Sequence, residues 1–182
     1  MFTKKFGSFV CEGDTITCEV EGFDITARIV RDDDSCEPWK ESDGHGPVSE
    51  WVRRGKRPGE RVVAEDRDSY RYYDYAEAIK IAKRDGWDAP PYGGTAGEKA
   101  ARAVERDYKA MKAWCNDEWF WCGVVLSVSR ADIELDDHAA ALWGIECNYP
   151  DSDNEYLTEV ANDLLSDALA AGKAALERLC KS

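Results

Sequence analysis

The feature that most constrains the fold is a continuous apolar run over residues 119–128, which is rich in valine and aromatic side chains. Such a run lacks the outward polar positions of a half-exposed strand and is typical of a strand buried on both faces. We therefore predict that residues 119–128 form a central strand of a β-sheet.

Other strands are predicted from alternation. Apolar and polar residues alternate over residues 16–20 and 23–29, and Glu21 and Gly22 separate the two segments. This pattern predicts an antiparallel hairpin. Shorter strands are predicted over residues 61–64, 133–135 and 141–147, of which 133–135 has the composition of an edge strand.

Three helices are predicted from periodicity and capping residues. Asp74 is a candidate N-cap and Gly86 a candidate stop for a helix between them. Thr95 and Glu98 form a capping box for a helix that reaches about residue 114. A third amphipathic helix is expected over residues 155–179.

These elements predict a single α+β domain over residues 1–182 with the order ββ-loop-αα-βββ-α. We expect an antiparallel sheet of about four to six strands with about three helices packed on it. Residues 35–60 are expected to be a long irregular segment, interrupted by one helical turn through residues 48–52, and irregular segments of this length are often functional.

Composition limits where the chain acts. There is no apolar run long enough to cross a bilayer and no apolar segment typical of a signal peptide near the N-terminus. The seven cysteines are an odd number and form no CxxC motif, which favours reduced thiols. We expect a cytoplasmic protein that does not bind a membrane.

Charge is unevenly distributed along the chain. The formal net charge is -13, and residues 116–182 contribute 4 basic and 14 acidic side chains, a net of -10. Negative charge of this size repels nucleic acid and favours a basic partner. The carboxylates expected to form a partner-binding acidic surface are Asp117, Glu118, Asp132, Glu134, Asp136, Asp137, Asp151, Asp153 and Glu155. The simpler interpretation is a solvated face that aids solubility.

The second candidate site is a glycine-flanked loop around His45. Asp43 is close enough in sequence to orient the imidazole, as in acid–base sites, and Trp51, Arg53 and Arg54 follow. This loop is a possible ligand site, but a turn with an exposed histidine explains the same residues. No phosphate-binding, hydrolase or metalloprotease motif is present, so we expect no catalytic residues, metal or cofactor.

Several motifs resemble those of a family of uncharacterised proteins encoded by bacteriophages, prophages and plasmids. They include SDGHGPVSEW over residues 42–51, KRPGER over 56–61, RYYD over 71–74 and LWGIE over 142–146. The resemblance covers about residues 13–180 and implies a bacterial host cytoplasm. It carries over no activity or site residues. By analogy, small acidic proteins in this setting are often inhibitors of host defence nucleases, of the anti-CRISPR or anti-restriction type.

Three functions follow as hypotheses. The leading one is an acidic protein that binds a basic host protein or nucleoprotein complex and inhibits it. The second is a small enzyme or small-ligand-binding protein that uses the His45 loop. The third is a structural or regulatory phage protein that forms a homodimer. Direct nucleic acid binding is not favoured.

Overall fold

The computed structural model describes residues 1–41 and 44–181, and within them the predicted α+β class is confirmed. The chain forms two compact units. Unit 1 is Met1–Ser35 with Trp119–Ser182, and unit 2 is the intervening segment Cys36–Glu118. The single domain expected over residues 1–182 stays a prediction, because this division reflects contacts and not independent folding.

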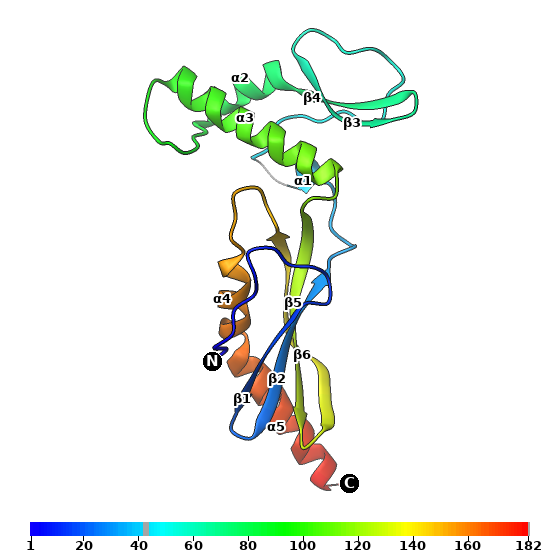
Figure 1. Ribbon diagram of the computed structural model, residues 1–182, viewed down its shortest axis with the longest axis vertical. Helices are drawn as coiled ribbons and strands as arrows, with labels where there is room; N and C mark the ends of the chain where they lie inside the picture. Colours follow the sequence, from blue (N-terminus) through cyan, green and yellow to red (C-terminus); the bar gives the residue numbers. More distant parts are fainter. Residues whose placement is uncertain (42–43, 182) are drawn as a thin grey trace. The chain divides into compact units, whose positions relative to one another are not determined.

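Unit 1 contains a four-stranded antiparallel sheet (Figure 1). Its strands are β1 (Thr15–Val20), β2 (Phe23–Arg31), β5 (Phe120–Arg130) and β6 (Ile133–Cys147), in the order β1-β2-β5-β6. The hairpin predicted over residues 16–20 and 23–29 is therefore confirmed. The apolar run forms β5, which lies between two other strands as predicted.

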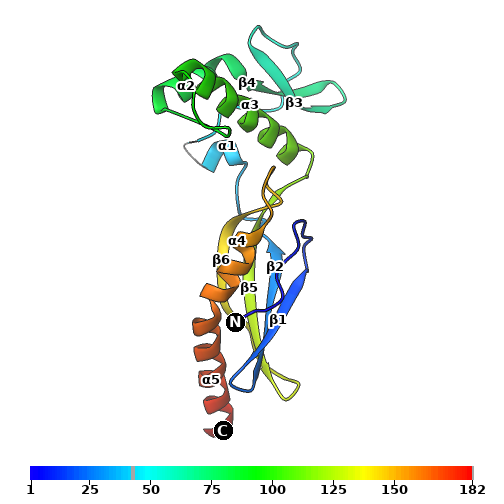
Figure 2. The ribbon, with the colours of Figure 1, turned by 60° about the vertical axis from the view of Figure 1, so that its left-hand side comes forward.

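Helices α4 (Glu155–Asp163) and α5 (Leu165–Lys181) cover one face of this sheet, as Figure 2 shows. The core between them includes Ile25, Leu126 and Val160. Gly172 of α5 is buried at the position where the helix approaches the sheet, and a Cβ there would meet the side chain of Val128. Its small size allows this close approach.

The opposite face of the sheet, which we call the open face, is more polar. It carries the exposed Thr17 and Arg28 and the half-buried Trp121 and Ser127. The prediction that the apolar run is buried on both faces is therefore wrong for part of β5. The run contains Ser127 at one of these positions, and Trp143 of β6 lies against Gly123 at another.

Unit 2 contains a two-stranded antiparallel sheet and three helices within its described residues. Its elements are α1 (Pro38–Glu41), β3 (Glu60–Asp66), β4 (Ser69–Asp74), α2 (Tyr75–Asp85) and α3 (Ala96–Cys115). Val48 and Val52 form isolated bridges with Tyr73 and Tyr70 of β4. The helical turn expected over residues 48–52 is therefore wrong, because this segment extends alongside β4.

The predicted caps of unit 2 are confirmed. The Asp74 carboxylate accepts a hydrogen bond from the backbone N–H of Glu77 at 2.9 Å, and Gly86 ends α2 in the left-handed conformation. Thr95 and Glu98 form the capping box at the start of α3. Both helices therefore begin where the local sequence places them.

Two predicted boundaries change near the C-terminus. Residues 133–135 and 141–147 belong to one strand, β6, whose pairing with β5 contains three register shifts. The predicted helix 155–179 divides at Leu164 into α4 and α5, just after Asn162, whose side chain donates to the carbonyl of Thr158 at 2.9 Å. In the described part of the chain, no helix combines the length and apolarity needed to cross a membrane.

Candidate functional site

The net negative charge of the chain belongs almost entirely to unit 1. Unit 2 has 16 basic and 17 acidic side chains, a net of -1, whereas the rest of the chain has 8 and 20, a net of -12. Along the sequence, the excess of acidic over basic side chains is concentrated in residues 116–182. The structure adds residues 1–35 to the same unit, so the N-terminal acidic residues contribute to the same electrostatic field.

The first group of predicted carboxylates lies on the β5–β6 hairpin. Arg130 pairs with Ile133, so the loop consists of Ala131 and Asp132 alone. Both loop residues have positive φ, 50° and 63°, which is the geometry of the turn type that matches strand twist in tight hairpins. This turn places Asp132 at the tip, while Glu134, Asp136 and Asp137 follow on β6.

Strand pairing adds two carboxylates that the sequence did not identify. Glu19 pairs with Asp24, Asp24 with Ser129, and Ser129 with Glu134. Paired residues point to the same face of a sheet, so these four form one row across all four strands. We call Glu19, Asp24 and Glu134 the acidic row. It lies on the open face, because Phe23 and Ile25 on either side of Asp24 point into the core.

The acidic row carries uncompensated charge. Glu19 and Asp24 stand directly opposite each other, an arrangement in which like charges destabilise a sheet. With strands about 4.8 Å apart, the row spans about 14 Å. Among the residues that the structure describes, no cation pairs with any of its three carboxylates. Alternation in the hairpin already indicated that Glu19 and Asp24 face outward, but their alignment with Glu134 depends on the pairing of β2 with β5.

The second predicted group lies at the other end of the sheet. Asp151, Asp153 and Glu155 belong to the segment between β6 and α4, and Figure 1 shows this segment and the β5–β6 turn at opposite ends of unit 1. Asp153 and Glu155 both make polar contacts. Asp153 accepts from the backbone N–H of Glu155 at 3.0 Å, and Glu155 pairs with Lys5 at 3.1 Å.

The remaining two predicted carboxylates belong to unit 2. Asp117 and Glu118 follow the end of α3, and Glu118 accepts from the Asn116 side chain at 3.0 Å. Within unit 1, the predicted residues form separate hairpin and loop groups, and do not form a single surface there. The hairpin group, extended by Glu19 and Asp24, is the stronger candidate because the row lacks compensating cations.

The His45 loop is held by a buried carboxylate on α3. Asp107 is only 6% exposed, and one of its oxygens lies 2.6 Å from Nδ1 of His45. The other oxygen accepts from the backbone N–H of Gly46 at 2.7 Å and from the hydroxyl of Tyr73 at 2.6 Å. We call these four residues the Asp107 clamp. Burial and the neighbouring carboxylate together raise the pKa of Tyr73 above its ordinary value, so the hydroxyl remains a donor.

The other predicted residues of this loop have different partners. Trp51 is 46% exposed and stacks on the guanidinium of Arg71. Arg53 pairs with Asp68 at 3.5 Å, on the surface. Arg54 forms a bidentate salt bridge with Glu60, with N–O distances of 2.6 and 2.7 Å, and this salt bridge lowers the pKa of Glu60 to about 2. Asp43 lies outside the described residues.

This arrangement favours a structural role for His45. Its side chain is only 11% exposed, and its Nδ1 is engaged by a carboxylate that also orders the backbone beside it. Nucleophilic chemistry is also disfavoured at Cys115 of the same unit, because burial raises the pKa of its thiol to about 11. The described residues contain no group of three or more side chains arranged to hold a metal ion.

No protein-family model, curated protein or solved structure matches the chain.

Proposed function

We propose that this protein is a binding protein that occupies a cationic groove of a host macromolecule through the open face of unit 1. The observation that carries the proposal is the acidic row, in which three carboxylates from three strands face solvent. None of them forms an ion pair with a basic side chain of the described residues. A surface that keeps like charges adjacent is suited to a partner that supplies the missing positive charge.

Three arginines of unit 2 support this proposal because each has an acidic partner within that unit. Arg54 pairs with Glu60, Arg61 with Glu105 and Arg71 with Glu37, at 2.6 to 3.0 Å. These arginines are therefore compensated inside unit 2. Unit 1 cannot compensate its carboxylates in this way, because it has 20 acidic and only 8 basic side chains, a net charge of -12.

The class of partner follows from this chemistry. A groove rich in lysine and arginine is what proteins use to hold the phosphates of nucleic acid. A protein that fills such a groove with carboxylates competes with nucleic acid for it. We therefore propose inhibition of a nucleic-acid-binding host complex. A defence nuclease of the CRISPR or restriction type is the specific prediction, by analogy with small acidic proteins of bacteriophages and plasmids.

The proposal is tested with two charge-reversal variants. The row variant is Glu19→Lys, Asp24→Lys and Glu134→Lys. The matched control reverses Asp151, Asp153 and Glu159 to Lys at the other end of unit 1, so the total charge changes equally. Partners are captured from bacterial lysate with the wild-type protein, identified by mass spectrometry and purified. The affinity of each variant for the purified partner is then measured, together with competition against a DNA duplex.

We expect the row variant to lose at least tenfold in affinity, mostly through slower association at low salt, and the control to lose much less. The wild-type protein should displace DNA from the partner. Equal losses in both variants would show that only total charge matters. An unchanged affinity of a correctly folded row variant would contradict the proposal, as would simultaneous binding of DNA and this protein.

A further inference from the structure

A different surface, the outer edge of β3 in unit 2, has unused backbone hydrogen-bonding groups. On the far side of β4, Ser49 donates its N–H to the carbonyl of Tyr72 at 2.8 Å, and Val52 and Tyr70 exchange two hydrogen bonds of 2.9 Å. Tyr70 and Tyr72 therefore direct their backbone groups away from β3.

The register then determines which groups of β3 face outward. In an antiparallel pair, two opposed residues either bond to each other or both point away. Tyr72 is opposed to Val62, and Tyr70 to Glu65. Val62 and Glu65 therefore direct their N–H and C=O groups to the outer edge, and they are three residues apart because a register shift between Val62 and Ala64 adds one residue to β3. The carbonyl of Val62 accepts from the hydroxyl of Tyr108 at 2.9 Å, but the described residues supply no partner for the other three groups.

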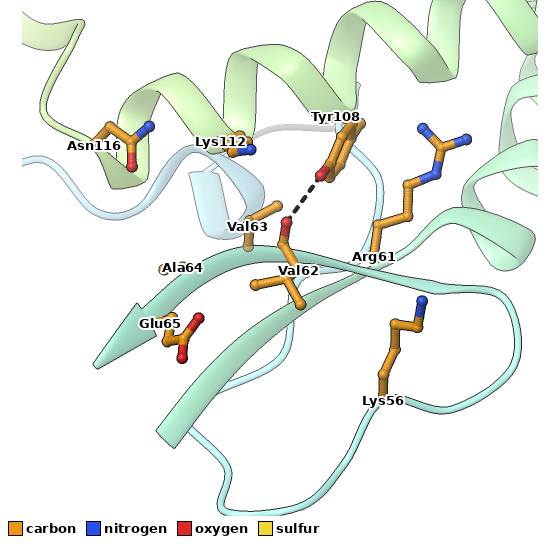
Figure 3. A pocket seen from close by; sticks show the side chains of 9 residues that line it. All are labelled: Lys56, Arg61, Val62, Val63, Ala64, Glu65, Tyr108, Lys112 and Asn116. Atoms are coloured by element: carbon orange, nitrogen blue, oxygen red, sulfur yellow. Dashed lines mark hydrogen bonds between the residues drawn. The ribbon is translucent and has the colours of Figure 1, made fainter. Parts of the chain in front are cut away.

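This edge borders a groove of about 550 Å³ between β3 and the C-terminal half of α3 (Figure 3). Its charged lining residues are Lys56, Arg61, Lys112 and Glu65, three cations and one carboxylate. Arg61 is engaged by Glu105 at 2.7 Å. Lys56 and Lys112 have no carboxylate partner in the described part of the chain, so the groove has unused positive charge beside unused backbone donors and an acceptor.

We propose that this groove binds an extended acidic peptide segment of another protein, which adds a strand to the outer edge of β3. Strand addition uses main-chain hydrogen bonds for affinity and flanking side chains for specificity. Here the Val62 and Glu65 backbone supplies the main-chain bonds, and Lys56 and Lys112 select carboxylates. A small anion would use the lysines alone and would not require the strand edge.

The edge itself is tested by a matched pair of substitutions, Glu65→Pro and Glu65→Ala. Both remove the same carboxylate, but only proline also removes the N–H that faces the groove. Proline is tolerated on an edge strand at a position whose N–H points away from the ladder. A third variant, Lys56→Ser with Lys112→Ser, removes the selecting charges, and circular dichroism confirms the fold of each.

The probe is a displayed library of random eight-residue peptides, selected on the full wild-type chain. We expect enriched peptides to be acidic and rich in β-branched residues. Their affinity should be equal or higher for Glu65→Ala, and at least tenfold lower for Glu65→Pro and for the double lysine variant. A library without acidic binders overturns the proposal. So does equal binding to the two Glu65 variants, the result expected for a site that recognises only charge.

Discussion

At the scale of single residues, Asp107 has a structural role that the sequence does not reveal. Its carboxylate is buried and accepts from groups on the His45 loop and from Tyr73 on β4, so it joins three separate segments of unit 2. A buried carboxylate is tolerated only when its hydrogen-bonding capacity is used. The interactions of the clamp therefore stabilise the native position of the loop.

We expect Asp107→Ala to lower the free energy of unfolding by about 3 kcal/mol, because three donors lose a common acceptor. Tyr73→Phe removes one donor and should cost about 1 kcal/mol. Chemical denaturation of each variant measures both values. Asp66→Ala is the control, since that residue is exposed and its substitution should change the stability by less than about 0.5 kcal/mol. Similar values for all three variants would contradict the clamp.

At the scale of secondary structure, α5 packs closely on the sheet because Gly172 has no side chain. Gly172 faces Val128 and Phe23 across a distance that leaves no room for a side chain. Glycine otherwise weakens a helix by about 1 kcal/mol relative to alanine. Its presence in the middle of α5 is therefore explained by close packing against the sheet.

Two alanine substitutions separate these effects. Gly172→Ala should destabilise the protein by about 1–2 kcal/mol, because overpacking outweighs the improved helix propensity. Gly97→Ala in α3 is the matched control. A Cβ at Gly97 meets nothing, so this variant should be neutral or more stable by up to about 1 kcal/mol. Thermal unfolding compares the two, and stabilisation by both variants would show that α5 adjusts freely.

The contrast between these elements explains what could be predicted from sequence. The apolar run of β5, the alternation in β1 and β2 and the caps of α2 and α3 are local signals, and they correctly predict these elements, although the run wrongly predicts burial on both faces of all of β5. Strand β4 was missed because Arg71 occupies a buried position. A pattern counts arginine as polar, whereas here Glu37 pairs with its charge and Trp39 and Trp51 stack on its guanidinium.

In the candidate sites, too, only the local features could be predicted from the sequence. The outward direction of Glu134 was readable from alternation, but its alignment with Glu19 and Asp24 depends on pairing between strands far apart in sequence. The partner of His45 was missed for a related reason. Asp107 lies 62 residues away on a helix, where an aspartate has no local signal that it is buried.

At the scale of the whole molecule, the two units differ in charge far more than in size. Unit 1 carries -12 and unit 2 carries -1. Self-repulsion therefore acts mainly within unit 1, and especially where Glu19 and Asp24 oppose each other. Dissolved salt screens such repulsion, since the Debye length falls from about 30 Å at 0.01 M to about 3 Å at 1 M.

We expect sodium chloride to stabilise unit 1 selectively. Hydrogen exchange of backbone amides in β1 and in the β5–β6 hairpin should slow as salt rises from 0.01 to 0.5 M, because repulsion across the acidic row weakens. Amides in β3 and β4 are the internal control and should show little change or faster exchange, because salt weakens the pairs of Arg54 and Arg61. A uniform response of both units would contradict a localised charge excess.

The insertion of unit 2 between β2 and β5 also shapes how the chain reaches its native state. These strands are neighbours, with Arg31 opposite Cys122, yet unit 2 separates them in the sequence. Closing a loop of that length costs about 3 kcal/mol more chain entropy than closing a two-residue turn. The pairing of β2 with β5 is thus the least local contact of the sheet. It forms most readily once unit 2 has become compact, because a compact segment shortens the span of chain that separates the two strands.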